Sequence, residues 1–198
     1  VTVRDLDYGE ENTATVTVDK LDTLSPAVTI SGGKDGWTNT DQTLTISASD
    51  TQSGVGKKWY KIVSNTDEIP TEGLTELTGN KITLSKEGRY YIYYKIYDNA
   101  GDTDLDREAN KTEGFKAVLI DKTAPTVSFG EYSANAGITV TATDITSKLA
   151  SLSYRIGNGT EIPITLTNGQ IEKVFTINDL PAGDNKITVT ATDNAGLS

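Results

Sequence analysis

The chain contains no cysteine, no histidine and no methionine among its 198 residues. It therefore lacks the commonest thiol nucleophile, the commonest general base and the side chains that hold most transition metals. An ordinary Ser-His-Asp triad is excluded, and neither a Gly-x-Ser-x-Gly elbow nor a phosphate-binding loop is present. Paired carboxylates remain, but the sequence identifies no aromatic-lined cleft around them. We expect no enzymatic activity and no required cofactor.

Long apolar runs are missing as well, since none approaches the roughly 20 residues that a membrane-spanning helix needs. The 28 acidic residues outnumber the 18 basic ones and give a net charge of −10. That charge opposes binding to nucleic acid and to anionic membranes, whereas hard cations are compatible with it. No signal peptide is recognisable. We therefore expect an excised or mature fragment with no nucleic-acid partner and no membrane insertion.

What the chain does contain is a tandem repeat. Asp144 follows Asp50 by 94 residues, and Asp193 follows Asp98 by 95 residues. The matching segments are residues 44–50 with 138–144, 60–62 with 154–156, and 90–101 with 185–196. A unit of roughly 95 to 100 residues is thus used twice, which is the size of a small β-sandwich.

The repeat predicts three domains. Residues 1–21 resemble the end of a copy and are predicted to be the C-terminal strands of a preceding module. Residues 22–122 form the first full module, and residues 123–198 form the second, which has no counterpart of the first module's last strand. Either that strand lies beyond residue 198, or the predicted strand from Thr13 to Val18 of another molecule pairs with the open edge. We expect a monomer, with edge-strand exchange as the alternative.

Alternation of apolar and polar residues predicts β-strands throughout. The inward positions of one strand recur in the other copy, as Leu44, Ile46 and Ala48 and then as Ile138, Val140 and Ala142. Turn sequences rich in Asn and Gly separate the strands, for example at residues 157–159 and 168–169. About seven short strands per module predict an all-β chain of two tandem immunoglobulin-like β-sandwiches.

Four motifs in this order resemble bacterial immunoglobulin-like modules, which are arranged in tandem in Gram-positive surface proteins and secreted glycan-active enzymes. They are Thr-Ala-Pro at 123–125, Ala-Thr-Asp at 142–144, Tyr-Arg-Ile at 154–156 and Asp-Asn-Ala-Gly at 193–196. The resemblance covers nearly the whole chain. It implies an extracellular location, on the bacterial surface or secreted, and a spacer or stalk that holds a distal domain away from the cell, with neighbouring modules as partners. Such modules sometimes act as adhesive heads. Two turns depart from the pattern, at residues 5–9 and 146–148.

Aspartates end equivalent strands that run in the same direction. Asp50 and Asp98 should therefore share one pole of the first module, and Asp144 and Asp193 one pole of the second. The entering chain brings Asp19 and Asp22 toward the first pair, and Asp121 and Lys122 toward the second. Each carboxylate can accept backbone N–H groups of the following turn. Alternatively, three oxygen donors on converging loops begin a calcium site at each junction.

A second calcium hypothesis concerns an acidic insertion between residues 101 and 114. Asp102, Asp104 and Asp106 are the candidate ligands, because the loop matches alternate positions of an EF-hand, continuing through Glu108, Asn110 and Glu113. The sixth position is Arg107 instead of glycine, and strands replace the flanking helices. The alternative is a solvated acidic loop neutralised by Arg107 and Lys111.

Aromatic residues give the last candidate site. If Tyr90, Ile92, Tyr94 and Ile96 face the core, then Tyr91, Tyr93 and Tyr97 face outward, with Trp59 on an adjacent strand. Such an exposed row can stack on sugar rings or pack on a protein, which makes an adhesive module for a host glycan or protein the alternative to a stalk. The competing interpretation is cross-strand pairing on the outer sheet face.

Overall fold

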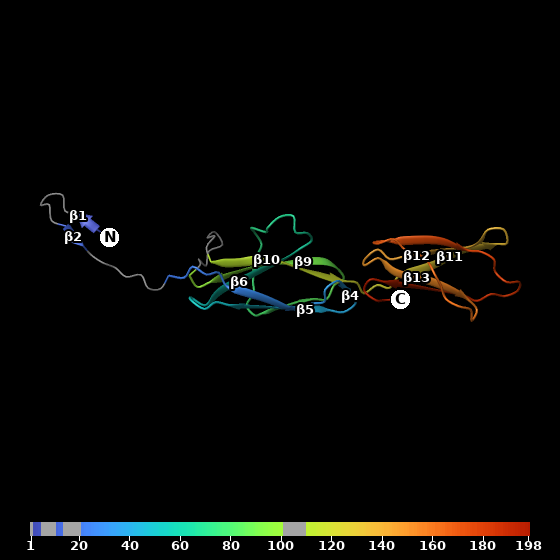
Figure 1. The fold of residues 1–198 in the computed structure, drawn as a ribbon, viewed down its shortest axis with the longest axis horizontal. Helices are drawn as coiled ribbons and strands as arrows, with labels where there is room; N and C mark the ends of the chain where they lie inside the picture. Colours follow the sequence, from blue (N-terminus) through green and yellow to red (C-terminus); the bar gives the residue numbers. More distant parts are fainter. Residues whose placement is uncertain (1, 5–10, 14–20, 101–109) are drawn as a thin grey trace.

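The computed structural model describes residues 2–4, 11–13, 21–100 and 110–198, and all their regular structure is β. The prediction of an all-β chain is confirmed for these residues. No helix in this part of the chain is long and apolar enough to cross a membrane. Figure 1 shows two groups of strands that follow one another along the long axis of the molecule, here called the first unit (residues 27–120) and the second unit (residues 126–193).

The first unit contains two sheets. The smaller has the order β3, β5, β8, and the larger has the order β4, β10, β9, β6, β7. Strands β4 and β10 pair in parallel, and the other pairs are antiparallel. Their bounds are β3 (Ala27–Gly32), β4 (Trp37–Thr38), β5 (Gln42–Ser49), β6 (Val55–Val63), β7 (Thr75–Glu76), β8 (Lys81–Leu84), β9 (Gly88–Asp98) and β10 (Lys111–Ile120).

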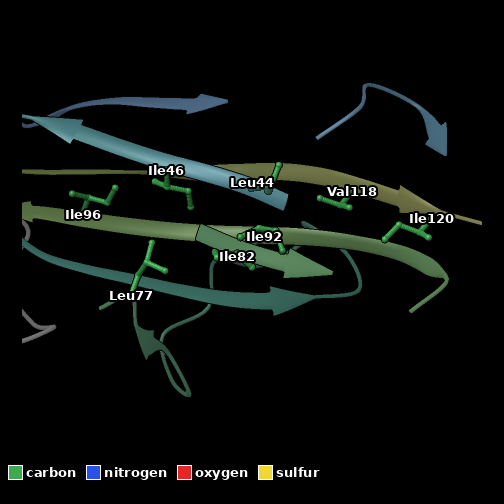
Figure 2. Packing of buried hydrophobic residues seen from close by; sticks show 8 residues of the cluster. All are labelled: Leu44, Ile46, Leu77, Ile82, Ile92, Ile96, Val118 and Ile120. Carbon is green, nitrogen blue, oxygen red and sulfur yellow. The ribbon is translucent and has the colours of Figure 1, made fainter. Parts of the chain in front are cut away.

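The two sheets of the first unit enclose an apolar core, shown in Figure 2. Alternation along β5 directs Leu44 and Ile46 inward, as predicted, and both are at most 1% exposed. The larger sheet supplies Ile92 and Ile96 from β9, which confirms the predicted inward face of that strand. The buried cluster consists of Leu44, Ile46, Leu77, Ile82, Ile92, Ile96, Val118 and Ile120.

The second unit also has two sheets, with the orders β11, β12, β15 and β14, β13, β16. Side chains from both sheets meet in a smaller buried cluster of Ala142, Leu149, Leu152 and Ala191. This arrangement is consistent with a β-sandwich. The strand bounds are β11 (Thr126–Ser133), β12 (Gly137–Thr143), β13 (Leu149–Ile156), β14 (Ile162–Pro163), β15 (Glu172–Ile177) and β16 (Ile187–Asp193).

No sheet of the described residues combines strands from both units, and the predicted boundary between residues 122 and 123 falls between β10 and β11. Near the N-terminus, β1 (Thr2–Arg4) pairs with β2 (Glu11–Thr13) in an antiparallel ribbon. Most of the strand predicted from Thr13 to Val18 lies outside the described residues, so edge-strand exchange stays a prediction. In the second unit, β16 pairs with β13 and forms one edge of its sheet.

Candidate functional site

Each unit carries three aspartates at the pole where the chain enters it. One carboxylate oxygen from each of Asp121, Asp144 and Asp193 lies within 4.8 Å of those of the other two. The same holds for Asp22, Asp50 and Asp98. The predicted convergence of these six residues is confirmed, whereas Asp19 lies outside the described residues. We call the first set the junction triad, because Asp121 follows β10 of the first unit while its two partners belong to the second.

Backbone N–H groups hold the carboxylates of the junction triad. Asp193 Oδ1 accepts hydrogen bonds from the N–H groups of Ala195 (2.8 Å) and Leu197 (2.9 Å). Asp144 Oδ1 accepts one from Lys148 N–H. These bonds confirm that the aspartates organise the turns that follow them, as Asx turns do.

Asp121 additionally links the two units. Its Oδ1 accepts the N–H of Thr123 at 3.0 Å, within the linker, and its Oδ2 accepts the N–H of Ser147 at 2.9 Å, in the loop between β12 and β13. The backbone N–H of Asp121 donates to the carbonyl of Thr38 in the first unit at 2.9 Å. One residue thus contacts both units.

The loops at the two poles share one hydrogen-bond pattern despite their different sequences. The Asn194 amide donates to the carbonyls of Ser147 and Lys148, at 2.7 and 2.9 Å, and the Asn99 amide donates to the Ser53 carbonyl at 2.9 Å. This explains the repeated Asp-Asn-Ala-Gly motif, in which Asp holds its own turn and Asn holds the facing loop.

The turn at residues 146–148 differs in sequence from the equivalent turn of the first unit but keeps its backbone geometry, at an energetic cost. Gly54 has a φ of 81° in the first unit, and Lys148 occupies the equivalent place with a φ of 74°. Glycine adopts this left-handed conformation without the steric penalty of a β-carbon, whereas lysine incurs it.

The two triads differ in electrostatics. Asp121, Asp144 and Asp193 are 0, 4 and 2% exposed. Burial, followed by repulsion from Asp121 and Asp193, raises the pKa of Asp144 above its usual range. In the first unit, hydrogen bonds from Ser53 and then from Leu24 lower the pKa of the more accessible Asp22.

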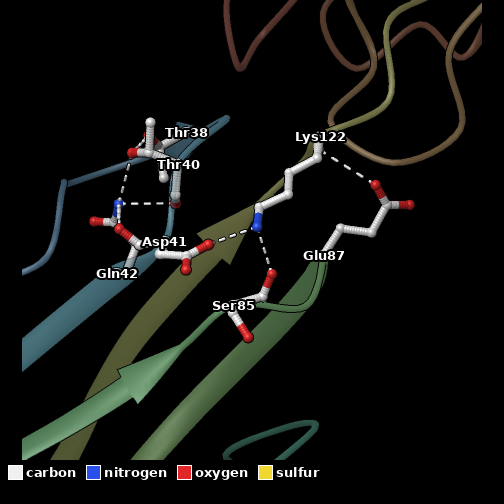
Figure 3. A network of polar contacts seen from close by, with 7 residues as sticks. All are labelled: Thr38, Thr40, Asp41, Gln42, Ser85, Glu87 and Lys122. Atoms are coloured by element: carbon white, nitrogen blue, oxygen red, sulfur yellow. Dashed lines mark hydrogen bonds and ion pairs between the residues drawn. The ribbon is translucent and has the colours of Figure 1, made fainter.

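Lys122 does not join the junction triad, although the sequence places it beside Asp121. Figure 3 shows its ammonium group between the Asp41 carboxylate and the Ser85 carbonyl, and the Ser85 contact is 2.6 Å long. The Lys122 N–H donates to Glu87 Oε2 at 3.2 Å, and the Thr123 hydroxyl donates to the same oxygen at 2.8 Å. These bonds hold the linker against the first unit.

The other calcium candidates, Asp102, Asp104 and Asp106, lie outside the described residues, together with Arg107 and Glu108. Of the last EF-hand positions, Glu113 lies on β10, where its carboxylate accepts the Tyr93 hydroxyl and pairs with Lys111 at 3.3 Å. Calcium binding by the insertion stays a prediction.

The aromatic candidates share the outer face of the larger sheet, but the prediction that they form an exposed row is wrong for two of them. Tyr93 and Tyr97 are each 1% exposed, while Tyr91 and Trp59 are half-buried. The Tyr93 ring packs on Phe115 from β10, with ring centroids 5.2 Å apart. The ammonium of Lys95 lies 5.4 Å from the centre of the Tyr97 ring. Alternation predicts the face of a strand but not what covers that face. Phe115 is paired with Tyr93 across β9 and β10, so it is the sequence feature that could have predicted this cover.

A scan against protein-family models gives no match for this chain, and a search of curated proteins gives none either.

Proposed function

We propose that this chain is a non-catalytic part of the stalk of a bacterial surface or secreted protein, built from tandem immunoglobulin-like modules that hold a distal domain away from the cell. The two facing sheets of each unit, with mostly antiparallel neighbours, support the assignment to this class of sandwich. The sequence resemblance supports the bacterial, extracellular context.

The observation that carries the proposal is a linker bonded on both sides. Lys122 and Thr123 are hydrogen-bonded to the first unit through Glu87, while Asp121 is hydrogen-bonded to the loop of the second unit through Ser147. A flexible tether would leave these groups in water. A linker held in this way limits bending between modules, which is what a spacer needs.

Two further features favour a spacer. Pro125 follows the bonded segment and restricts the backbone where the second unit begins. The two units lie end to end in Figure 1 instead of packing side by side, so each added module lengthens the molecule.

Small-angle X-ray scattering tests the proposal. We expect an elongated particle whose pair-distance distribution stays narrow in cross-section, as two units held in line produce. The control variant carries Gly-Ser-Gly-Ser inserted between Lys122 and Thr123, which separates the two sets of linker bonds. The insertion should broaden the range of conformations. The proposed stalk function would be contradicted by a compact native particle, or by equal flexibility of the native chain and the insertion variant.

A further inference from the structure

We propose that Asp121, Asp144 and Asp193 bind one divalent cation, with the chemistry of Ca²⁺, at the junction between the two units. Binding of the ion is independent of the stalk function proposed above. Only its mechanical consequence, a stiffer joint, rests on that function.

The first argument is uncompensated charge. The three carboxylates are almost fully buried, and among the described residues none of them forms an ion pair with a lysine or an arginine. The nearest basic residue in sequence, Lys122, is paired with Asp41. Buried carboxylates are strongly disfavoured unless a proton, a cationic group or a metal ion neutralises them.

The second argument is independent of the clustering. Asp193 Oδ1 is bonded to two backbone N–H groups, but Oδ2 of the same carboxylate is buried with no hydrogen-bond partner in the described part of the chain. The hydroxyl oxygen of Ser147, whose N–H contacts Asp121, is also buried without a partner there. Buried oxygens of this kind need a partner that the protein does not supply, such as a bound cation or an ordered water, because their lost hydration is otherwise not replaced.

The donor set selects the class of ion. Carboxylate and hydroxyl oxygens suit hard cations, and the chain has no cysteine or histidine to favour softer metals. The three carboxylate oxygens lie within 4.8 Å of one another, which lets a single ion contact all of them. Mg²⁺ gives up its water ligands reluctantly and needs a strict octahedron, whereas Ca²⁺ accepts a flexible set of protein oxygens, so a buried site of this kind favours Ca²⁺.

The location gives the ion a structural role. Asp121 comes from the end of the first unit, and Asp144 and Asp193 come from the second, so a shared ion joins the two units directly. It also removes the repulsion among the three carboxylates. The Asp121 to Ser147 hydrogen bond then acts together with an ionic contact at the same joint.

Calorimetric titration of the whole chain with CaCl₂, up to about 10 mM because extracellular modules bind weakly, tests the proposal. The Asp193→Asn variant should bind one Ca²⁺ per chain fewer than the native chain. This difference does not depend on whether Asp22, Asp50 and Asp98 also bind an ion. The matched control is Asp184→Asn, an exposed carboxylate of the same unit that should keep the native stoichiometry. MgCl₂ should bind more weakly than CaCl₂.

Thermal unfolding separates ion binding from a merely structural role of Asp193. In chelator, Asp193→Asn should be at least as stable as the native chain, because asparagine keeps an oxygen acceptor and removes a buried charge. In Ca²⁺, the native second unit should gain melting temperature and the variant should not. Asp144→Asn gives the same test if Asp193→Asn fails to fold.

Absence of saturable Ca²⁺ binding by the native chain would overturn the proposal, and so would unchanged stoichiometry in both triad variants. Scattering recorded both in chelator and in Ca²⁺ keeps this result apart from the stalk. An elongated, stiff particle without Ca²⁺ binding would refute the ion alone, whereas a particle that binds Ca²⁺ and stays flexible in both conditions would refute the stalk alone.

Discussion

Asp121 Oδ2 accepts the Ser147 N–H at 2.9 Å, and both residues are buried although Asp121 follows the first unit and Ser147 lies in the second. This bond places the end of β10 against the loop between β12 and β13. Because the hydrogen-bonded groups are shielded from water, losing one partner leaves the other unsatisfied. The Asp121 carboxylate is therefore one of the groups that fix the orientation of the two units, together with the linker bonds to Glu87.

Asp121→Ala should loosen the joint and reduce stability by about 1 to 3 kcal/mol, since the Ser147 N–H loses its acceptor. The lack of cysteine allows spin labels to be placed at Ser47→Cys and Thr176→Cys, two exposed strand positions in different units. Pulsed electron paramagnetic resonance in chelator should show a broader distance distribution for Asp121→Ala.

The matched control for that experiment is Asp22→Ala, which removes the equivalent carboxylate at the other pole of the first unit. Its Oδ2 accepts the Ser53 N–H at 3.0 Å, and the joint between the labelled positions is untouched. A distribution that broadens equally in both variants would show that Asp121 has no special role in orientation.

The convergence of the triads could be predicted from sequence because strand direction and repeat offset are properties of the chain itself. Asp144 directly follows β12 and Asp193 ends β16, two strands that run toward the same pole, and Asp121 precedes the next strand. The partner of Asp121 could not be predicted in this way. Ser147 stands at the same repeat position as Ser53, but a repeat in the sequence does not show which backbone N–H meets the carboxylate, because tertiary packing positions that group.

Lys148→Gly should stabilise the second unit by about 1 kcal/mol. Lysine at a φ of 74° incurs the left-handed steric penalty that Gly54 avoids at the equivalent position. Both tryptophans, Trp37 and Trp59, lie in the first unit. Circular dichroism should therefore show a later unfolding transition for the second unit, while the tryptophan fluorescence transition stays in place. A lower melting temperature of Lys148→Gly would mean that the lysine side chain stabilises the second unit by more than its left-handed backbone conformation costs.

Gly56→Ala should destabilise the first unit by about 1 to 3 kcal/mol, because an added β-carbon would lie 2.5 Å from the carbonyl oxygen of Asp98. Relief of that clash requires movement of the backbone beside the aspartates of this pole. Denaturant unfolding followed by tryptophan fluorescence measures the loss. Gly79→Ala is the control, since a β-carbon there meets nothing within 4 Å and the change should stay within about 0.5 kcal/mol. Equal effects of the two substitutions would contradict the steric explanation.

Tyr93→Ala should destabilise the first unit by about 3 to 5 kcal/mol, as expected when a buried aromatic ring is removed. Tyr93→Phe keeps the ring against Phe115 and loses the hydroxyl bond to Glu113, so it should cost about 0.5 to 1.5 kcal/mol. Tyr91→Ala, at the half-buried neighbouring position of the same face, should cost less than Tyr93→Ala. Tryptophan fluorescence during urea unfolding distinguishes the three variants. A small loss of stability in Tyr93→Ala would show that this tyrosine behaves as a surface residue. A glycan array that compares the native chain with Tyr91→Ala would then be the next test of adhesion.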